Sequence, residues 1–126
     1  MSETRETVGA DELLDALQEY TARANASPRV AKTLAGWTCR IHIEATDTGD
    51  ARFTLEVAGG RAESPAAGLH GVPDLVVRGH SMDLAEIFWG DANPVSNYMQ
   101  GAIKTQGRAD DVMRLDAMAM FIFLNQ

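Results

Sequence analysis

The sequence predicts an α+β fold in which helices cover one face of a five-stranded, largely antiparallel sheet. Apolar residues recur at helical spacing near both ends of the chain, whereas the middle alternates apolar and polar residues with a period of about two. Glycine and proline separate these stretches. Two such layers bury each other's apolar faces. Since 126 residues suit one domain, we expect a single domain over residues 1–126, with residues 1–9 disordered.

The N-terminal part carries two helical patterns with start and stop signals. From Asp11 to about Asn25, apolar residues recur three and four positions apart, and acidic residues in the first turn complement the helix dipole. Ser27 is predicted to cap a second helix that begins at Pro28 and stops at Gly36. Two helices are therefore expected before the first strand.

From residue 37 the alternation predicts strands. In TCRIHIEA, positions 39, 41, 43 and 45 are apolar and those between them are polar, and ARFTLEVA repeats the pattern. The intervening DTGD predicts a hairpin, so these strands should pair antiparallel with one wet face. RAESPAA reads as a weaker strand that Pro65 places at an edge or ends early. PDLVVRG and AIKTQG complete the five.

Two short helices are expected between the last two strands, and one helix after them. HSMDLAEIFWG has Ser81 as its predicted N-cap and Gly90 as its stop, and NPVSNYMQG uses Asn93 and Gly101 in the same way. The closing helix, residues 108–123, is acidic at its start and apolar almost all round in its second half. Such a helix is either buried by a partner or lines a pocket.

The composition excludes several classes of function. A formal net charge of -7 argues against nucleic acid and against a polybasic membrane anchor, because both depend on Lys and Arg. No run approaches the roughly 18 apolar residues of a membrane span, and no secretory signal pattern is seen. We therefore expect a cytoplasmic protein without stable membrane insertion. Cys39 is the only cysteine, so an intrachain disulfide is impossible.

The stretch GDANPVSNYMQGAIKTQG has the glycines and the lysine of a phosphate-binding loop. Such a loop places its glycines between a strand and the start of a helix, where backbone N–H groups converge on the phosphate. Here Gly90 and Gly101 each follow a helical pattern, and Lys104 lies inside a predicted strand. The glycines are better explained as helix C-caps.

Other chemistry-bearing residues lack a complete pattern. His42 and Glu44 share one strand face, but the spacing brings no third metal ligand to them. Ser81 follows His80, yet a Ser–His pair also needs an orienting third group. The acidic start of the closing helix is explained by the helix dipole. We expect no metal, no cofactor and no catalytic residue.

Methionine and aromatic residues cluster in the last third of the chain. Apart from Met1, every methionine lies at or beyond residue 82, together with most of the Phe and Trp residues. Methionine fills irregular gaps and is frequent at adaptable apolar binding surfaces. Composition leaves both an ordinary core and a ligand cavity open, and an ordinary core is the commoner outcome.

Between Val72 and Phe121 several short patterns follow one another in a fixed order. They are an apolar strand opened by Asp74, a short helix closed by Gly90, an Asn-Pro helix start, the sequence Gly-x-Ile-Lys-x-x-Gly over residues 101–107, and a closing helix. This order and spacing resemble the lipid-carrier domain of the sterol carrier protein type-two family. The hairpin from residue 37 to residue 60 resembles that domain in general pattern.

The resemblance implies helices and sheet that enclose an internal apolar tunnel, with a lid-like closing helix at Ala109 to Phe123. It also implies a non-catalytic carrier of a fatty acid, a sterol or another apolar small molecule. The chain departs from the family in lacking basic residues that would steer acyl-CoA phosphates and a peroxisomal C-terminal tail. The residues expected to line the tunnel are Phe88, Trp89, Tyr98, Met99, Met113, Met118 and Phe121.

Two other functions stay open at this point. An accessory or dimerisation module would bury its last helix in a homodimer or against a partner enzyme. A cofactor-free isomerase or dehydratase on a cone-shaped α+β fold would need an Asp/His or Asp/Tyr pair inside its cavity. Such folds usually end on long strands, whereas this chain is predicted to end on a helix.

Overall fold

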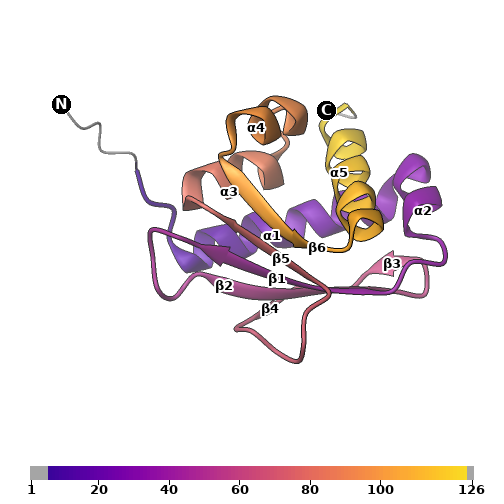
Figure 1. Cartoon of the computed structure of the whole chain (residues 1–126), viewed down its shortest axis with the longest axis horizontal. Helices are drawn as coiled ribbons and strands as arrows, with labels where there is room; N and C mark the ends of the chain where they lie inside the picture. The colour runs from indigo at the N-terminus through magenta and orange to yellow at the C-terminus, as the bar shows by residue number, and fades with distance from the viewer. Residues whose placement is uncertain (1–5, 125–126) are drawn as a thin grey trace.

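Helices and sheet form two layers, with the helices on one face of the sheet (Figure 1). The computed structural model describes residues 6–124, except for the side chains of residues 97–99. The long helix α1 (Ala10–Ala26) packs against α3 (Ser81–Trp89), while α5 (Ala109–Leu124) packs mainly against α2 (Pro28–Leu34). The two-layer α+β prediction is confirmed.

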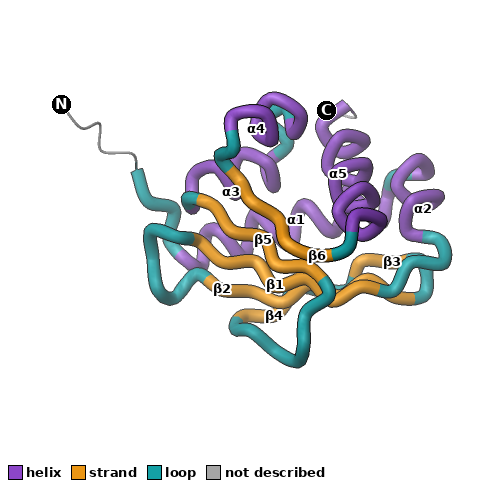
Figure 2. The backbone as a smooth tube through the Cα atoms, viewed as in Figure 1, coloured by secondary structure: helices purple, strands orange, loops and turns teal. Residues whose placement is uncertain are grey.

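The sheet is built on the predicted hairpin of β1 (Cys39–Ala45) and β2 (Arg52–Ala58), which pair antiparallel. On its other side β1 pairs parallel with β5 (Leu75–Gly79), and β5 pairs antiparallel with β6 (Ile103–Gly107). The strand order is β3-β2-β1-β5-β6, as the tube in Figure 2 shows. The sheet is thus largely antiparallel, with one parallel pair at its centre.

The predicted strand RAESPAA is divided in two. β3 (Arg61–Ala62) and β4 (Ala66–Ala67) both pair antiparallel with β2, and β4 lies off the main five-stranded path. Pro65 sits between them and has no backbone N–H to donate to a ladder. The break therefore follows from the proline that predicted an early end.

Most helix ends are where the sequence places them. The Ser27 side chain accepts a hydrogen bond from the backbone N–H of Val30, and Gly90 ends α3 in the left-handed region at φ 82°. In front of α4 (Pro94–Gln100), the Asn93 side chain accepts from the N–H of Val95 at 2.9 Å. These contacts satisfy groups that a helix end leaves unpaired.

The predicted N-cap of α3 is wrong by one residue. The cap is His80, whose Nδ1 accepts a hydrogen bond from the N–H of Met82 at 3.1 Å. The Ser81 hydroxyl instead donates to Asp47 on the β1–β2 loop, 2.8 Å away. The Ser81 side chain therefore bonds to Asp47, a residue distant in sequence, and does not cap the helix as local sequence rules predict.

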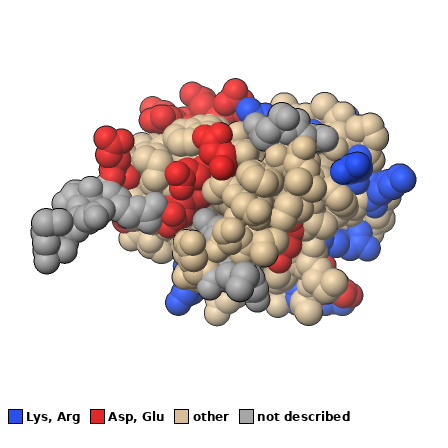
Figure 3. Space-filling view, turned by 90° about the horizontal axis from the view of Figure 1, so that it is seen from above, with Lys and Arg blue, Asp and Glu red and all other residues tan. Residues whose placement is uncertain are grey.

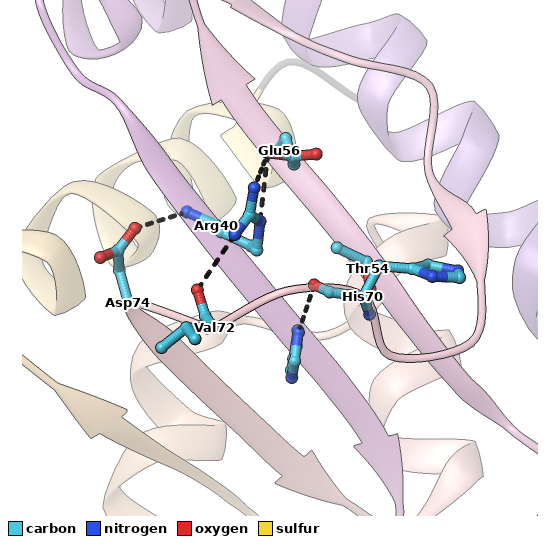
Figure 4. A network of polar contacts seen from close by, with 7 residues as sticks. Arg40, Thr54, Glu56, His70, Val72 and Asp74 are labelled. Carbon is cyan, nitrogen blue, oxygen red and sulfur yellow. Dashed lines mark hydrogen bonds and ion pairs between the residues drawn. The ribbon is translucent and has the colours of Figure 1, made fainter.

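The outer face of the sheet is only partly wet, because the loop before β5 lies across it. His42 and Thr54 were expected on the wet face, yet both are buried. The ring Nε2 of His42 lies 2.9 Å from the backbone carbonyl of His70, and the Thr54 hydroxyl accepts from the His70 N–H. Beside them Arg40 forms an ion pair with Glu56 at 3.2 Å (Figure 4).

The packed domain begins before the first helix. Val8 is 3% exposed, and its backbone N–H donates to the Ser81 hydroxyl at 2.8 Å. Disorder was expected over residues 1–9. Residues 1–5 lie outside the described residues, whereas Val8 is held by burial and by this hydrogen bond.

Candidate ligand-binding site

An apolar cavity of about 80 Å³ lies between the sheet and the helices. Aliphatic side chains of the strands line it, among them Ile41, Leu55 and Val77. Leu17 of α1 and Phe88 of α3 line it as well. These side chains are at most 7% exposed, so the two layers themselves create the cavity.

The cavity is smaller than a lipid. Small-molecule sites typically measure roughly 300–1,000 Å³, several times its volume. The family resemblance implies an open tunnel. Within the described residues, the structure has this compact cavity instead. A long apolar ligand would therefore have to widen it.

Three polar side chains interrupt the apolar lining: Tyr20 of α1, Thr105 of β6 and Asp116 of α5. Tyr20 is 2% exposed, and its ring centre lies 5.4 Å from that of Phe88. Asp116 is exposed, so it marks the rim of the cavity. The carboxylate thus sits where solvent and the apolar interior meet.

The cavity perturbs both of its ionisable groups. Burial raises the pKa of Tyr20 well above its usual value, and the negative charge of Asp116 raises it further. Loss of hydration raises the pKa of the Asp116 carboxyl. Tyr20 is therefore a neutral phenol at physiological pH, and it lies near enough to Asp116 to respond to its charge.

The sequence pattern of the SCP-2 sterol transfer family matches residues 14–120 of the chain. The chain belongs to this family. The described fold and the apolar cavity agree with that membership, and together they support lipid or sterol binding. Among curated proteins, none matches the chain significantly in sequence.

Solved structures of SCP-2 domains share the fold. A protein described as UbiJ-SCP2, a ubiquinone synthesis protein, has a TM-score of 0.66 at 12% identity, covering 94% of this chain and 98% of its own. A sterol carrier protein 2 crystal structure has 0.64 at 16%, covering 87% and 92%. The palmitated SCP2L2 of Aedes aegypti has 0.58 at 18%, covering 90% and 95%. At these identities the likeness is one of fold.

The SCP-2 domain places four of the expected tunnel residues in or beside the cavity region. Phe88 lines the cavity, and Met118 is fully buried in the adjoining core. Trp89 and Phe121 are half-buried and pack against that core. Of these four residues, Phe88 is the one whose ring packs against Tyr20 at the cavity.

Of the other three expected residues, the structure describes only the side chain of Met113, which does not line the cavity. Met113 is 68% exposed on α5. The side chains of Tyr98 and Met99 lie outside the described residues. The sequence missed Tyr20 and Asp116, although an acidic residue within the apolar half of the closing helix was an available signal.

A second polar cluster of the SCP-2 domain joins Asp47, Ser81 and His80. Asp47 accepts hydrogen bonds from the N–H and the hydroxyl of Ser81, both at 2.8 Å, and its carboxylate lies 3.2 Å from His80 Nε2. Burial alone would raise the pKa of Asp47, but the hydrogen bonds from Ser81 hold it below its usual value. Ser81 is fully buried, so this cluster joins the hairpin loop to α3.

The remaining candidate ligands are separated or occupied. The His42 ring contacts a backbone carbonyl, and the His70 ring lies 2.8 Å from the carbonyl of Ala67. Over residues 6–124, no three His, Cys, Asp or Glu side chains come together as a metal site. Burial, followed by the charges of two aspartates, raises the pKa of Cys39 to about 12, which leaves a protonated thiol. None of the helices in the described part of the chain has the length and apolar character needed to cross a bilayer.

Proposed function

We propose that this SCP-2 domain binds and carries a small apolar ligand, such as a fatty acid, a sterol or a related lipid, without catalysis. The observation that supports this most directly is the apolar cavity between the layers, lined by Ile41, Leu55 and Phe88. The proposed setting is cytoplasmic, which suits a chain with one buried, protonated thiol and a net charge of -7.

Burial of apolar surface supplies the affinity. At about 25 cal/mol per Å², a chain that hides a few hundred Å² gains several kcal/mol before the cost of association. The ligand must first widen a cavity of about 80 Å³. We propose that α4 and α5 move apart for this, since Pro94 and Leu115 line the cavity and α4 contacts α5 and β6.

The test fills the cavity and asks whether binding is lost. Ala119 is 9% exposed and lines the cavity, whereas Ala109 is exposed at the start of the same helix. We expect Ala119→Leu to weaken binding of the neutral apolar dye Nile red at least tenfold, and Ala109→Leu to leave binding unchanged. Circular dichroism checks that both variants fold. Failure of the unmodified protein to bind either the dye or any co-purifying lipid, read by native mass spectrometry, would overturn the proposal.

An accessory role is a second candidate, because apolar side chains on two helices are exposed and available to a partner. On the helical side, acidic side chains gather toward one end and Lys and Arg toward the other (Figure 3). Val95, Met113 and Leu124 of α4 and α5 are more than half exposed. The UbiJ-SCP2 neighbour, described as a ubiquinone synthesis protein, makes a partner enzyme a reasonable occupant. Sedimentation velocity tests self-association: a dimer that Met113→Lys dissociates would favour this role.

A further inference from the structure

The described lining of the cavity contains polar and acidic side chains but no basic ones. Its polar groups are two hydroxyls, from Tyr20 and Thr105, and one carboxylate, from Asp116. Lys, Arg and His are absent from the described lining. An apolar ligand that ends in a polar group would therefore meet hydroxyls, which donate and accept hydrogen bonds, and a negative charge, but no cation.

Tyr20 and Asp116 are both without a fixed partner. Within the described residues, the phenol hydroxyl and the carboxylate form no hydrogen bond or ion pair, and since every fully buried side-chain polar atom there has a partner, both groups keep some access to the cavity or to solvent. A tyrosine hydroxyl in an apolar setting normally finds a partner, and a polar group of a ligand can supply one at this position. The two groups come from α1 and α5, which pack against each other. They are free to engage a ligand that enters between these helices.

The two common head groups of single-chain lipids differ at this site. A hydroxyl can donate to the Asp116 carboxylate and accept from the Tyr20 phenol, so both protein groups gain a partner. A carboxylate can accept from Tyr20 but is repelled by Asp116, and the lining offers no positive charge to offset its lost hydration. The lining thus favours a head group that can donate a hydrogen bond over an anionic one.

On the basis of the proposed function, we propose that Tyr20 and Asp116 select the polar end of the ligand. The cavity takes a neutral lipid that carries a hydroxyl group and discriminates against one that carries a carboxylate. Asp116 is the residue that rejects the anion, and Tyr20 donates to the oxygen of the accepted hydroxyl.

The experiment compares 1-hexadecanol with hexadecanoate as competitors for Nile red at pH 8, with both lipids below their aggregation limits. Their chains are identical in length, and the acid is charged at this pH. An alcohol is intrinsically more apolar than an anion, so the ratio of the two affinities in the unmodified protein is only the reference. The deciding quantity is the change of that ratio in matched variants.

We expect Asp116→Asn to strengthen hexadecanoate binding about fivefold or more while leaving hexadecanol within about twofold, since it removes a partly screened like charge. Asp110→Asn makes the same charge change on the same helix away from the cavity lining, and we expect it to leave the ratio unchanged. Tyr20→Phe keeps the ring in place and should weaken hexadecanol severalfold without weakening Nile red.

The experiment distinguishes failure of this head-group proposal from failure of the proposed carrier function. Loss of binding of Nile red and of both lipids by the unmodified protein would defeat the carrier proposal itself. Binding of the dye and the lipids, with the same affinity ratio in Asp116→Asn as in Asp110→Asn, would overturn the role of Asp116. Unchanged hexadecanol affinity in Tyr20→Phe would overturn the role of Tyr20.

Discussion

The floor of the cavity and its outer wall are packed very differently. Ile41 and Leu55 of the central hairpin are at most 1% exposed, whereas of the α5 residues that line the cavity Leu115 is half-buried and Asp116 is exposed. Separating two elements costs little free energy where their apolar side chains are already partly exposed to solvent. We therefore expect the sheet to stay rigid and α5 to be the element that moves when a ligand enters.

The largest expected effect removes a core side chain of the hairpin that forms the floor. Phe53→Ala should lower the free energy of unfolding by about 3–5 kcal/mol, because it leaves a cavity at a fully buried site. Met113→Ala, on the exposed side of α5, should stay within about 0.5 kcal/mol. Urea unfolding measures both. Equal losses would mean that α5 is packed as tightly as the hairpin.

A smaller effect concerns the link between the hairpin loop and α3. Asp47→Asn should cost about 1–2 kcal/mol at pH 7, because the carboxylate accepts two hydrogen bonds from Ser81. The folded-state pKa of Asp47 lies below its unfolded value, so this stabilisation is present above about pH 4 and is lost as the pH falls through the folded value.

Unfolding measured at pH 7 and at pH 3 checks this dependence. The gap between the unmodified protein and Asp47→Asn should narrow at the lower pH. Asp91→Asn, at an exposed position after α3, serves as the control and should show no gap at either pH. A gap that stays constant from pH 7 to pH 3 would contradict the assignment.

The smallest expected effect is a difference in the dynamics of α5 and the sheet. Amide hydrogen exchange should be faster in the outer turns of α5 than in β1, since α5 has fewer buried contacts. Saturation with an apolar ligand such as Nile red should slow exchange in α5 severalfold and leave β1 unchanged. Slowing confined to β1 would place the moving part in the sheet.

Much of the fold could be predicted from short-range patterns. Alternation around Ile41 and Leu55 determined the hairpin and the face that is buried, and the Ser27, Asn93 and Gly90 signals set helix ends correctly. These features depend on backbone preferences and on neighbours within a few residues. Phe88, which the family resemblance implied as a tunnel residue, lines the cavity.

The composition of the site was decided only in three dimensions. Tyr20 and Asp116 lie 96 positions apart in the chain and line one cavity because α1 and α5 pack over the same sheet. Tertiary contacts also decided the roles of two further residues. Ser81 bonds to Asp47 and does not cap α3, and His42 is buried beneath the loop before β5. Local patterns determined which elements form and which side of each is apolar. Where those sides meet, and which polar groups are enclosed between them, depended on long-range packing that no short stretch of sequence encodes.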